Sequence, residues 1–213
     1  MTTIARALAH PRVARIARML AERPGVILDD PVARHAAVAL ILRLADDGDV
    51  ELLMIQRAVF PGDPWSGHIA LPGGRREPED ASLEQTAIRE TLEETGFDLS
   101  INGHLLGTLD EVHPRAPRLP SLIIRPHVFV APRDVTIVTS AEVAEAFWVP
   151  LPLLAHPSAT GEATFTDRGV ERTERSFRLG QHVVWGLTER ILRQFIGYAC
   201  DERASDGASR AMG

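Results

Sequence analysis

The stretch from Leu71 to Asp98 constrains the fold of this chain more than any other. Two adjacent glycines, Gly73 and Gly74, precede a segment with a helical pattern, and Gly96 follows that segment. Paired glycines let the backbone approach a ligand or metal closely, and a glycine after a helix supplies a left-handed cap. The sequence therefore predicts a glycine loop that leads into a short helix.

Three acidic residues of this predicted helix, Glu90, Glu93 and Glu94, stand at positions i, i+3 and i+4 and share one face. Like charges at these spacings destabilise a helix by roughly 0.2–0.5 kcal/mol per pair. A bound cation offsets that repulsion, and clustered carboxylate oxygens suit Mg²⁺ or Mn²⁺. The alternative is a solvated acidic face without a ligand.

The helix itself has predictable ends and a predictable packed side. Asp80 or Ser82 is suited to cap its start, and Gly96 ends it. A packed side that leaves the glutamates pointing outward would consist of Leu83, Ala87, Ile88, Thr91 and Leu92.

The remaining chain reads as a mixed sheet covered by helices, which is an α/β (α+β) fold. An Asp-Gly turn at 46–49 joins two apolar strands, and an irregular loop follows them. Helices are predicted at 11–22 and 183–198, and strands at 36–44, 50–58, 68–71, 103–113, 122–130, 145–149, 163–165 and 175–177.

A single domain is sufficient for 213 residues. We expect it to span residues 33–200, preceded by a helical extension at 1–32 and followed by a disordered tail at 201–213. The segment 5–21 is rich in arginine and lacks acids, as in organellar transit peptides. Its apolar stripe of Val13, Ile16 and Leu20 favours a structural helix instead.

Composition excludes several classes of protein. The net charge of −6 argues against binding of nucleic acid through its phosphates. The longest apolar run, residues 36–42, is far too short to span a membrane. The single cysteine, Cys200, cannot form an internal disulfide and fits a cytoplasmic protein.

The segment 89–97, Arg-Glu-Thr-Leu-Glu-Glu-Thr-Gly-Phe, together with Gly74 resembles the signature of Nudix hydrolases, G-x5-E-x7-R-E-U-x-E-E-x-G-U, where U is aliphatic. Two departures stand out. One extra residue separates Gly74 from Arg89, which brings Asp80 or Ala81 to the position of the first glutamate. Thr91 occupies an aliphatic position.

The extra residue is similar to what the coenzyme A pyrophosphatase branch of this family shows. Three further segments resemble the same branch, although 62–64 lacks the second basic residue of the upstream motif. These segments are 57–74, 142–150 and 184–188.

The resemblance implies a Nudix-type α/β/α sandwich that hydrolyses a diphosphate bond with Mg²⁺ or Mn²⁺. Glu90 and Glu94 are then the leading metal ligands, and Glu93, the carbonyl of Gly74 and Glu145 complete the set. The general base is Glu90 first, with Glu93 or Glu145 as alternatives. Arg89 is expected to pair with a glutamate and hold it in place, and Gly96 is expected to end the helix.

Substrate contacts are less sharply indicated by the sequence. Arg57, His68 and Gly73 are candidates to contact phosphate, although Arg57 also suits the surface and His68 a backbone contact. Trp65 is suited either to stack on a nucleobase or to anchor its loop. The other tryptophans, Trp148 and Trp185, are predicted to lie in the core.

Three functions follow from these expectations. The first is hydrolysis of coenzyme A or its thioesters to a phosphopantetheine fragment and adenosine 3′,5′-bisphosphate. The second is the same chemistry on a nucleotide sugar, a dinucleotide or an oxidised nucleotide. The third is a Nudix fold that only binds a ligand, as a regulator. The partner is in each case a small molecule rather than nucleic acid or a membrane, and a homodimer that uses the N-terminal helix is possible.

Overall fold

A mixed sheet at the centre of the molecule carries helices on both faces. The computed structural model describes residues 3–61, 65–114, 121–167 and 170–200. Strand β1 pairs in parallel with β6, and the other pairs of this sheet are antiparallel. The strands are β1 (Arg34–Leu44), β2 (Val50–Arg57), β3 (Ile69–Ala70), β4 (Gly73–Arg75), β5 (His104–Thr108), β6 (Leu122–Val130) and β7 (Val143–Pro150). The mixed α/β sandwich predicted from the sequence is thus confirmed.

Strands β1 and β2 begin as a tight hairpin and then diverge. Gly48 has a φ of +88° in the turn, as the Asp-Gly pair predicts. The two strands pair only near the turn, between residues 42–44 and 50–52. Beyond that point β4 pairs with β1 and β3 pairs with β2. The divergence therefore inserts the segment 69–75, with both glycines, into the middle of the sheet.

Helix α3 (Leu83–Thr95) follows the inserted segment and covers one face of the sheet. The side chain of Ser82 accepts the N–H of Gln85, and Gly96 takes the left-handed conformation. Ser82, and not Asp80, therefore caps the helix. A small second core between α3 and the sheet includes Leu83, Ala87, Ile41 and Phe129.

The predicted packed side of α3 is wrong at two positions. Leu92 is 43% exposed, whereas Glu94 is only 4% exposed. The helix is rotated so that its C-terminal half borders the glycine segment, which offers polar N–H groups in place of an apolar surface. Glu94 consequently points inward.

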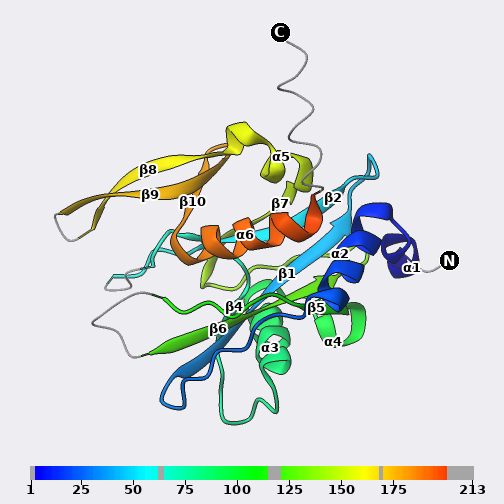
Figure 1. Ribbon diagram of the computed structural model, residues 1–213, viewed down its shortest axis with the longest axis horizontal. Coiled ribbons are helices and arrows are strands. Elements are labelled where there is room, and N and C mark those ends of the chain that lie inside the picture. Colours follow the sequence, from blue (N-terminus) through cyan, green and yellow to red (C-terminus); the bar gives the residue numbers. More distant parts are fainter. Residues whose placement is uncertain (1–2, 62–64, 115–120, 168–169, 201–213) are drawn as a thin grey trace, which may run out of the picture.

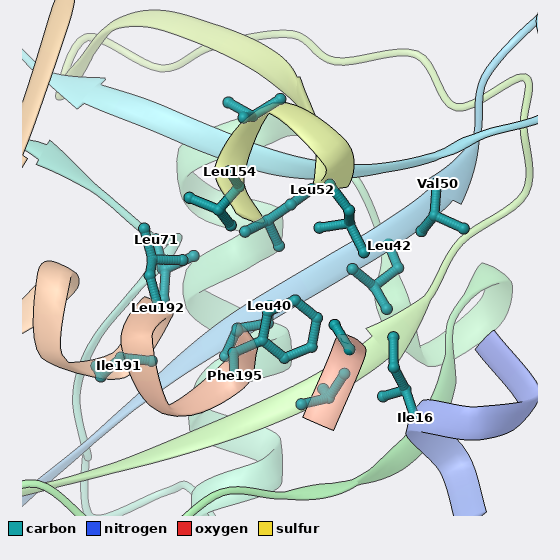
Figure 2. Close-up of a cluster of buried hydrophobic side chains, with 14 of the residues drawn as sticks. Ile16, Leu40, Leu42, Val50, Leu52, Leu71, Leu154, Ile191, Leu192 and Phe195 are labelled. Carbon is teal, nitrogen blue, oxygen red and sulfur yellow. The ribbon is translucent and has the colours of Figure 1, made fainter. Parts of the chain in front are cut away.

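The larger core lies on the opposite face, where α2 (Pro11–Glu22) and α6 (Gly186–Ala199) pack together. Figure 2 shows side chains of both helices meeting those of β1 and β2. Val13, Ile16 and Leu20 are all buried, so the apolar stripe that favoured a structural helix packs within the chain.

A second, smaller sheet joins the C-terminal part to this core (Figure 1). Its strands are longer than the sequence predicts, and β10 replaces the first turn of the predicted final helix. The sheet contains β8 (Thr160–Asp167), β9 (Val170–Leu179) and β10 (His182–Trp185). The short elements α1 (Thr3–Leu8), α4 (Leu99–Asn102), α5 (Leu151–Ala155) and the 3-10 turn η1 (Pro157–Ala159) complete the described fold. The predicted tail, 201–213, lies outside the described residues.

Candidate active site

The two glycines of β4 stand where no side chain fits. A Cβ atom on Gly74 would lie 2.4 Å from the carboxyl group of Glu90. On Gly73, whose φ is +149°, it would lie 2.3 Å from the carbonyl oxygen of Ala37. The N–H of Gly73 donates to Oε2 of Glu94 at 2.9 Å. Glu90 and Glu94, which we call the inner glutamates of α3, therefore both pack against the glycine backbone.

Arg89 ties the helix to the segment in front of it. Its Nε and Nη2 donate to the two carboxylate oxygens of Asp80, each at 3.0 Å. Nη2 also donates to the carbonyl of Arg75 at 2.9 Å, and Nη1 donates to Glu90 and Glu93, each at 3.1 Å. This guanidinium fixes Glu90 from one side while Gly74 fixes it from the other.

Asp80 is the residue that the sequence analysis placed least well. It is buried, and it also accepts the hydroxyl of Thr86 and the N–H of Glu77. The Arg89 guanidinium holds the pKa of the Asp80 carboxyl well below its usual range. The signal in the sequence was its spacing, because Asp80 follows Gly74 at the interval that the signature gives its first glutamate, and the extra residue lies between Asp80 and Arg89.

The carboxyl groups of the two inner glutamates both have raised pKa values. Burial raises the pKa of the Glu94 carboxyl to about 7, with a further rise from the negative charge of Glu90. The N–H of Gly73 and the positive charge of Arg57 act in the opposite direction. Burial also raises the pKa of Glu90, and Arg89 opposes this shift. A buried carboxylate, Glu94, thus lies beside the partly buried carboxylate of Glu90.

Glu142 is a further acidic residue that the sequence analysis did not select. Its negative charge contributes to the raised pKa of both Glu90 and Glu94. Its carbonyl oxygen accepts the N–H of Ala58, which follows Arg57 at the end of β2. The start of β7 therefore faces the glutamates of α3.

The other predicted site residues lie in different surroundings. Glu93 is largely exposed and pairs with Arg89. Glu145 lies 3.7 Å from Nε2 of His182, and the alternate residues that follow it, Phe147 and Val149, pack in the core on the α6 side. Because α3 covers the other face, the structure does not bring Glu145 together with the inner glutamates.

His68 and Trp185 are also in contact. The centroids of the two rings lie 4.7 Å apart.

A groove of about 660 Å³ lies between β9 and α6 in the described ranges. Its lining contains none of the predicted site residues and includes Arg175, Glu189, Arg190 and Arg193.

Carboxylate and carbonyl oxygens at Glu90, Glu94 and Gly74 are the donor types that Mg²⁺ and Mn²⁺ prefer. The raised pKa of Glu94 reflects its own burial and the negative charge of Glu90 beside it, and a divalent cation would stabilise both carboxylates in their charged form. No three His, Cys, Asp or Glu side chains of the described residues are grouped closely enough to form a metal cage. The donors that are present fit a cation held by two carboxylates together with water and substrate oxygens.

Comparison with known proteins agrees with this geometry. Residues 33–169 match the model of the NUDIX domain family. The mitochondrial coenzyme A diphosphatase NUDT8 of Mus musculus is 33% identical over 163 residues, which are 75% of this chain and 76% of the mouse protein. No helix in the described ranges is long and apolar enough to cross a membrane.

Two further comparisons concern length and fold. The uncharacterized protein C14C4.10c of Schizosaccharomyces pombe is 37% identical over 143 residues, covering 58% of this chain and 44% of that protein. This chain thus spans less than half the length of that relative. A MutT/nudix family protein from Enterococcus faecalis superposes with a TM-score of 0.52 at 19% identity, over 91% of this chain and 70% of that structure, and it supports the fold.

Proposed function

The chain belongs to the Nudix hydrolase family, and from this premise we propose that it hydrolyses the diphosphate bond of a nucleoside diphosphate derivative, with coenzyme A or its thioesters as the first candidates. The observation that carries the proposal is the pair of adjacent carboxylates, buried Glu94 and partly buried Glu90, held against the backbone of Gly73 and Gly74. The carboxylates of a solvent-exposed acidic helix would not need to pack against a glycine backbone in this way.

A divalent cation, Mg²⁺ or Mn²⁺, would neutralise diphosphate charge and acidify water at this site. Glu90, Glu94 and the Gly74 carbonyl would hold it. Arg89 keeps Glu90 in place through the hydrogen bond from Nη1. Arg57, whose positive charge acts on Glu94, is suited to receive a phosphate group of the substrate.

Hydrolysis requires a base that takes a proton from water as that water attacks phosphorus and the bridging P–O bond breaks. Glu90 remains our first candidate, because Gly74 and Arg89 fix its carboxylate. Glu142 joins Glu93 as an alternative, since it lies at the start of β7 and its charge acts on both inner glutamates. Glu145 is a weaker candidate because it lies beside His182.

Coenzyme A ranks first for two reasons. The extra residue between Gly74 and Arg89 is the feature that resembles the coenzyme A branch, and it lies in a segment that Asp80 ties to Arg89 by two hydrogen bonds. A relative that shares 33% identity over three quarters of the chain is named a coenzyme A diphosphatase. Other diphosphates, or a role in ligand binding alone, remain the competing hypotheses.

We also propose a cytoplasmic location from the single cysteine, which cell fractionation would test.

The test is a panel of coenzyme A, acyl derivatives, NADH, ADP-ribose, diadenosine polyphosphates and dNTPs, each with Mg²⁺ and with Mn²⁺. We expect coenzyme A compounds to give the highest kcat/KM. The Glu94→Gln variant should lose at least about 100-fold in kcat, because a ligand of the cation is lost. The variant Glu84→Gln, in the first turn of α3, is the matched control. Absence of turnover across the whole panel would favour a binding-only protein.

A further inference from the structure

Three aromatic side chains meet where the small sheet approaches the central sheet. The ring of Trp185, the last residue of β10, stacks on Phe165 of β8 with a centroid distance of 4.3 Å and an interplanar angle of 21°. The ring of His68 lies 4.7 Å from Trp185 and is tilted by 58°. All three side chains are partly exposed. We call His68, Phe165 and Trp185 the aromatic trio.

The small sheet presents Trp185 on the face that its own core does not use. Val184 and Phe177 are fully buried and oppose each other in register, within the core beside α6. Trp185 is the next residue after Val184, so its side chain leaves the opposite face of the strand. A role in core packing therefore accounts for Val184 and leaves Trp185 unexplained.

A continuous set of contacts connects the trio to the candidate active site. The carbonyl oxygen of His68 accepts the N–H of Arg57 at 3.0 Å. Arg57 lies close enough to Glu94 for its charge to act on that carboxylate. Strand β10 also contacts β3, which leads directly into the glycine segment. The trio is thus linked to Arg57 through the backbone of His68 and to the glycine segment through β3.

We propose that the aromatic trio is the surface on which the planar base of the substrate stacks while its diphosphate lies at Glu90 and Glu94. Aromatic side chains bind any nucleobase through its π face, and such contacts tolerate different bases. The proposal rests on the proposed function. It adds a recognition element in which His68 and Phe165 lie within the family match at 33–169 and Trp185 lies beyond it.

The test compares two non-hydrolysable probes in the presence of Mg²⁺. Methylenebisphosphonate and α,β-methylene-ADP share the same diphosphonate, and only the second carries a nucleoside. Calorimetry with the full-length chain measures Kd for each. We expect Trp185→Ala to weaken binding of α,β-methylene-ADP by at least about fivefold and to leave methylenebisphosphonate within twofold of the wild type.

Two more variants separate recognition from folding. Phe165→Leu, on the projecting hairpin, should weaken the same probe in the same direction if Trp185→Ala fails to fold. Trp148→Phe is the matched control, because Trp148 lies on β7 beneath the guanidinium of Arg43, away from the trio. This control should bind both probes as the wild type does.

Three outcomes would overturn the proposal. The first is an equal loss of affinity for both probes in the variants, and the second is unchanged affinity for both probes in Trp185→Ala and Phe165→Leu. The third is a wild-type chain that binds α,β-methylene-ADP no more tightly than methylenebisphosphonate. A chain that shows the expected difference between probes but hydrolyses no diphosphate would retain the aromatic trio and refute the proposed function. Hydrolysis without the expected difference would do the reverse.

Discussion

The charge of Glu94 depends on what occupies the candidate active site. Its pKa is raised from 4.5 to about 7, so the folded chain favours the protonated form. The contribution of this group to stability is fully present below pH 4.5 and is lost as the pH rises through 7. Without a cation, the protein therefore holds an unfavourable buried charge at pH 8.

The first prediction concerns Glu94→Gln in chelator-treated protein. At pH 8 the variant should be more stable than the wild type by roughly 2–4 kcal/mol, and the difference should largely vanish at pH 4. Urea unfolding at the two pH values measures this. Glu93→Gln, at an exposed position, is the control and should show no such trend. Equal stability of Glu94→Gln and wild type at pH 8 would contradict the burial argument.

Asp80 gives the second prediction at this scale. Asp80→Asn replaces an acceptor of two Arg89 hydrogen bonds by a group that is partly a donor. We expect a loss of roughly 2–3 kcal/mol at pH 7. Because the pKa of Asp80 is lowered in the folded chain, its contribution is present above pH 3.8 and is lost as the pH falls through the folded value.

Denaturant unfolding of Asp80→Asn at pH 7 and pH 3 gives the measurement. The stability gap to the wild type should narrow at the lower pH. Glu79→Gln, at an exposed position in the same segment, serves as the control. A variant as stable as the wild type at pH 7 would mean that Arg89 finds another acceptor.

At the scale of single elements, α3 shows what sequence patterns contain and what they omit. Its start and end were predictable because capping depends on local residue types such as Gly96. Its buried side was not, because the partner of Glu94 is a backbone N–H brought in by the divergence of two strands. Strand β10 was hidden for a similar reason, since its pairing with β9 depends on tertiary contacts.

Thr91 tests how α3 accommodates a departure from the aliphatic residue of the signature. The side chain is fully buried, and its hydroxyl donates to the carbonyl of Ala87 at 2.7 Å. Thr91→Val keeps the volume and frees no buried partner, so stability should change by less than about 1 kcal/mol, with activity retained. Thr91→Ser keeps the hydroxyl but removes a methyl group and should cost roughly 1 kcal/mol. Thermal unfolding compares the two, and a larger loss in Thr91→Val would refute this account.

At the scale of the whole molecule, the N-terminal extension is bound into the larger core. The sequence predicted the helix at 11–22, but it could not reveal that the stripe packs on α6, from the far end of the chain. We propose that residues 1–32 are a structural part of the unit, although the family match begins at residue 33. The glutamates were likewise predictable from their motif, whereas the positions of Asp80 and Glu142 beside the residues of α3 are seen only in the folded chain.

Ile16→Ala tests this arrangement. The side chain of Ile16 is fully buried between α2 and the core, so the substitution should cost roughly 2–5 kcal/mol through lost contacts and a cavity. Arg18→Ala, on the exposed side of the same helix, should change stability by less than about 0.5 kcal/mol. Equal effects of the two substitutions in urea unfolding would show that the extension is dispensable.

The divergence of β1 and β2 also has a consequence for synthesis on the ribosome. The glycine segment, Asp80, Arg89 and both inner glutamates all belong to residues 73–94, so their contacts are local in sequence and form quickly. The parallel partner of β1 starts at Leu122, and α6 comes later still. We therefore expect the nascent chain to complete its candidate active-site segment while β1 still lacks its pairing with β6, and this interval is when aggregation competes with folding.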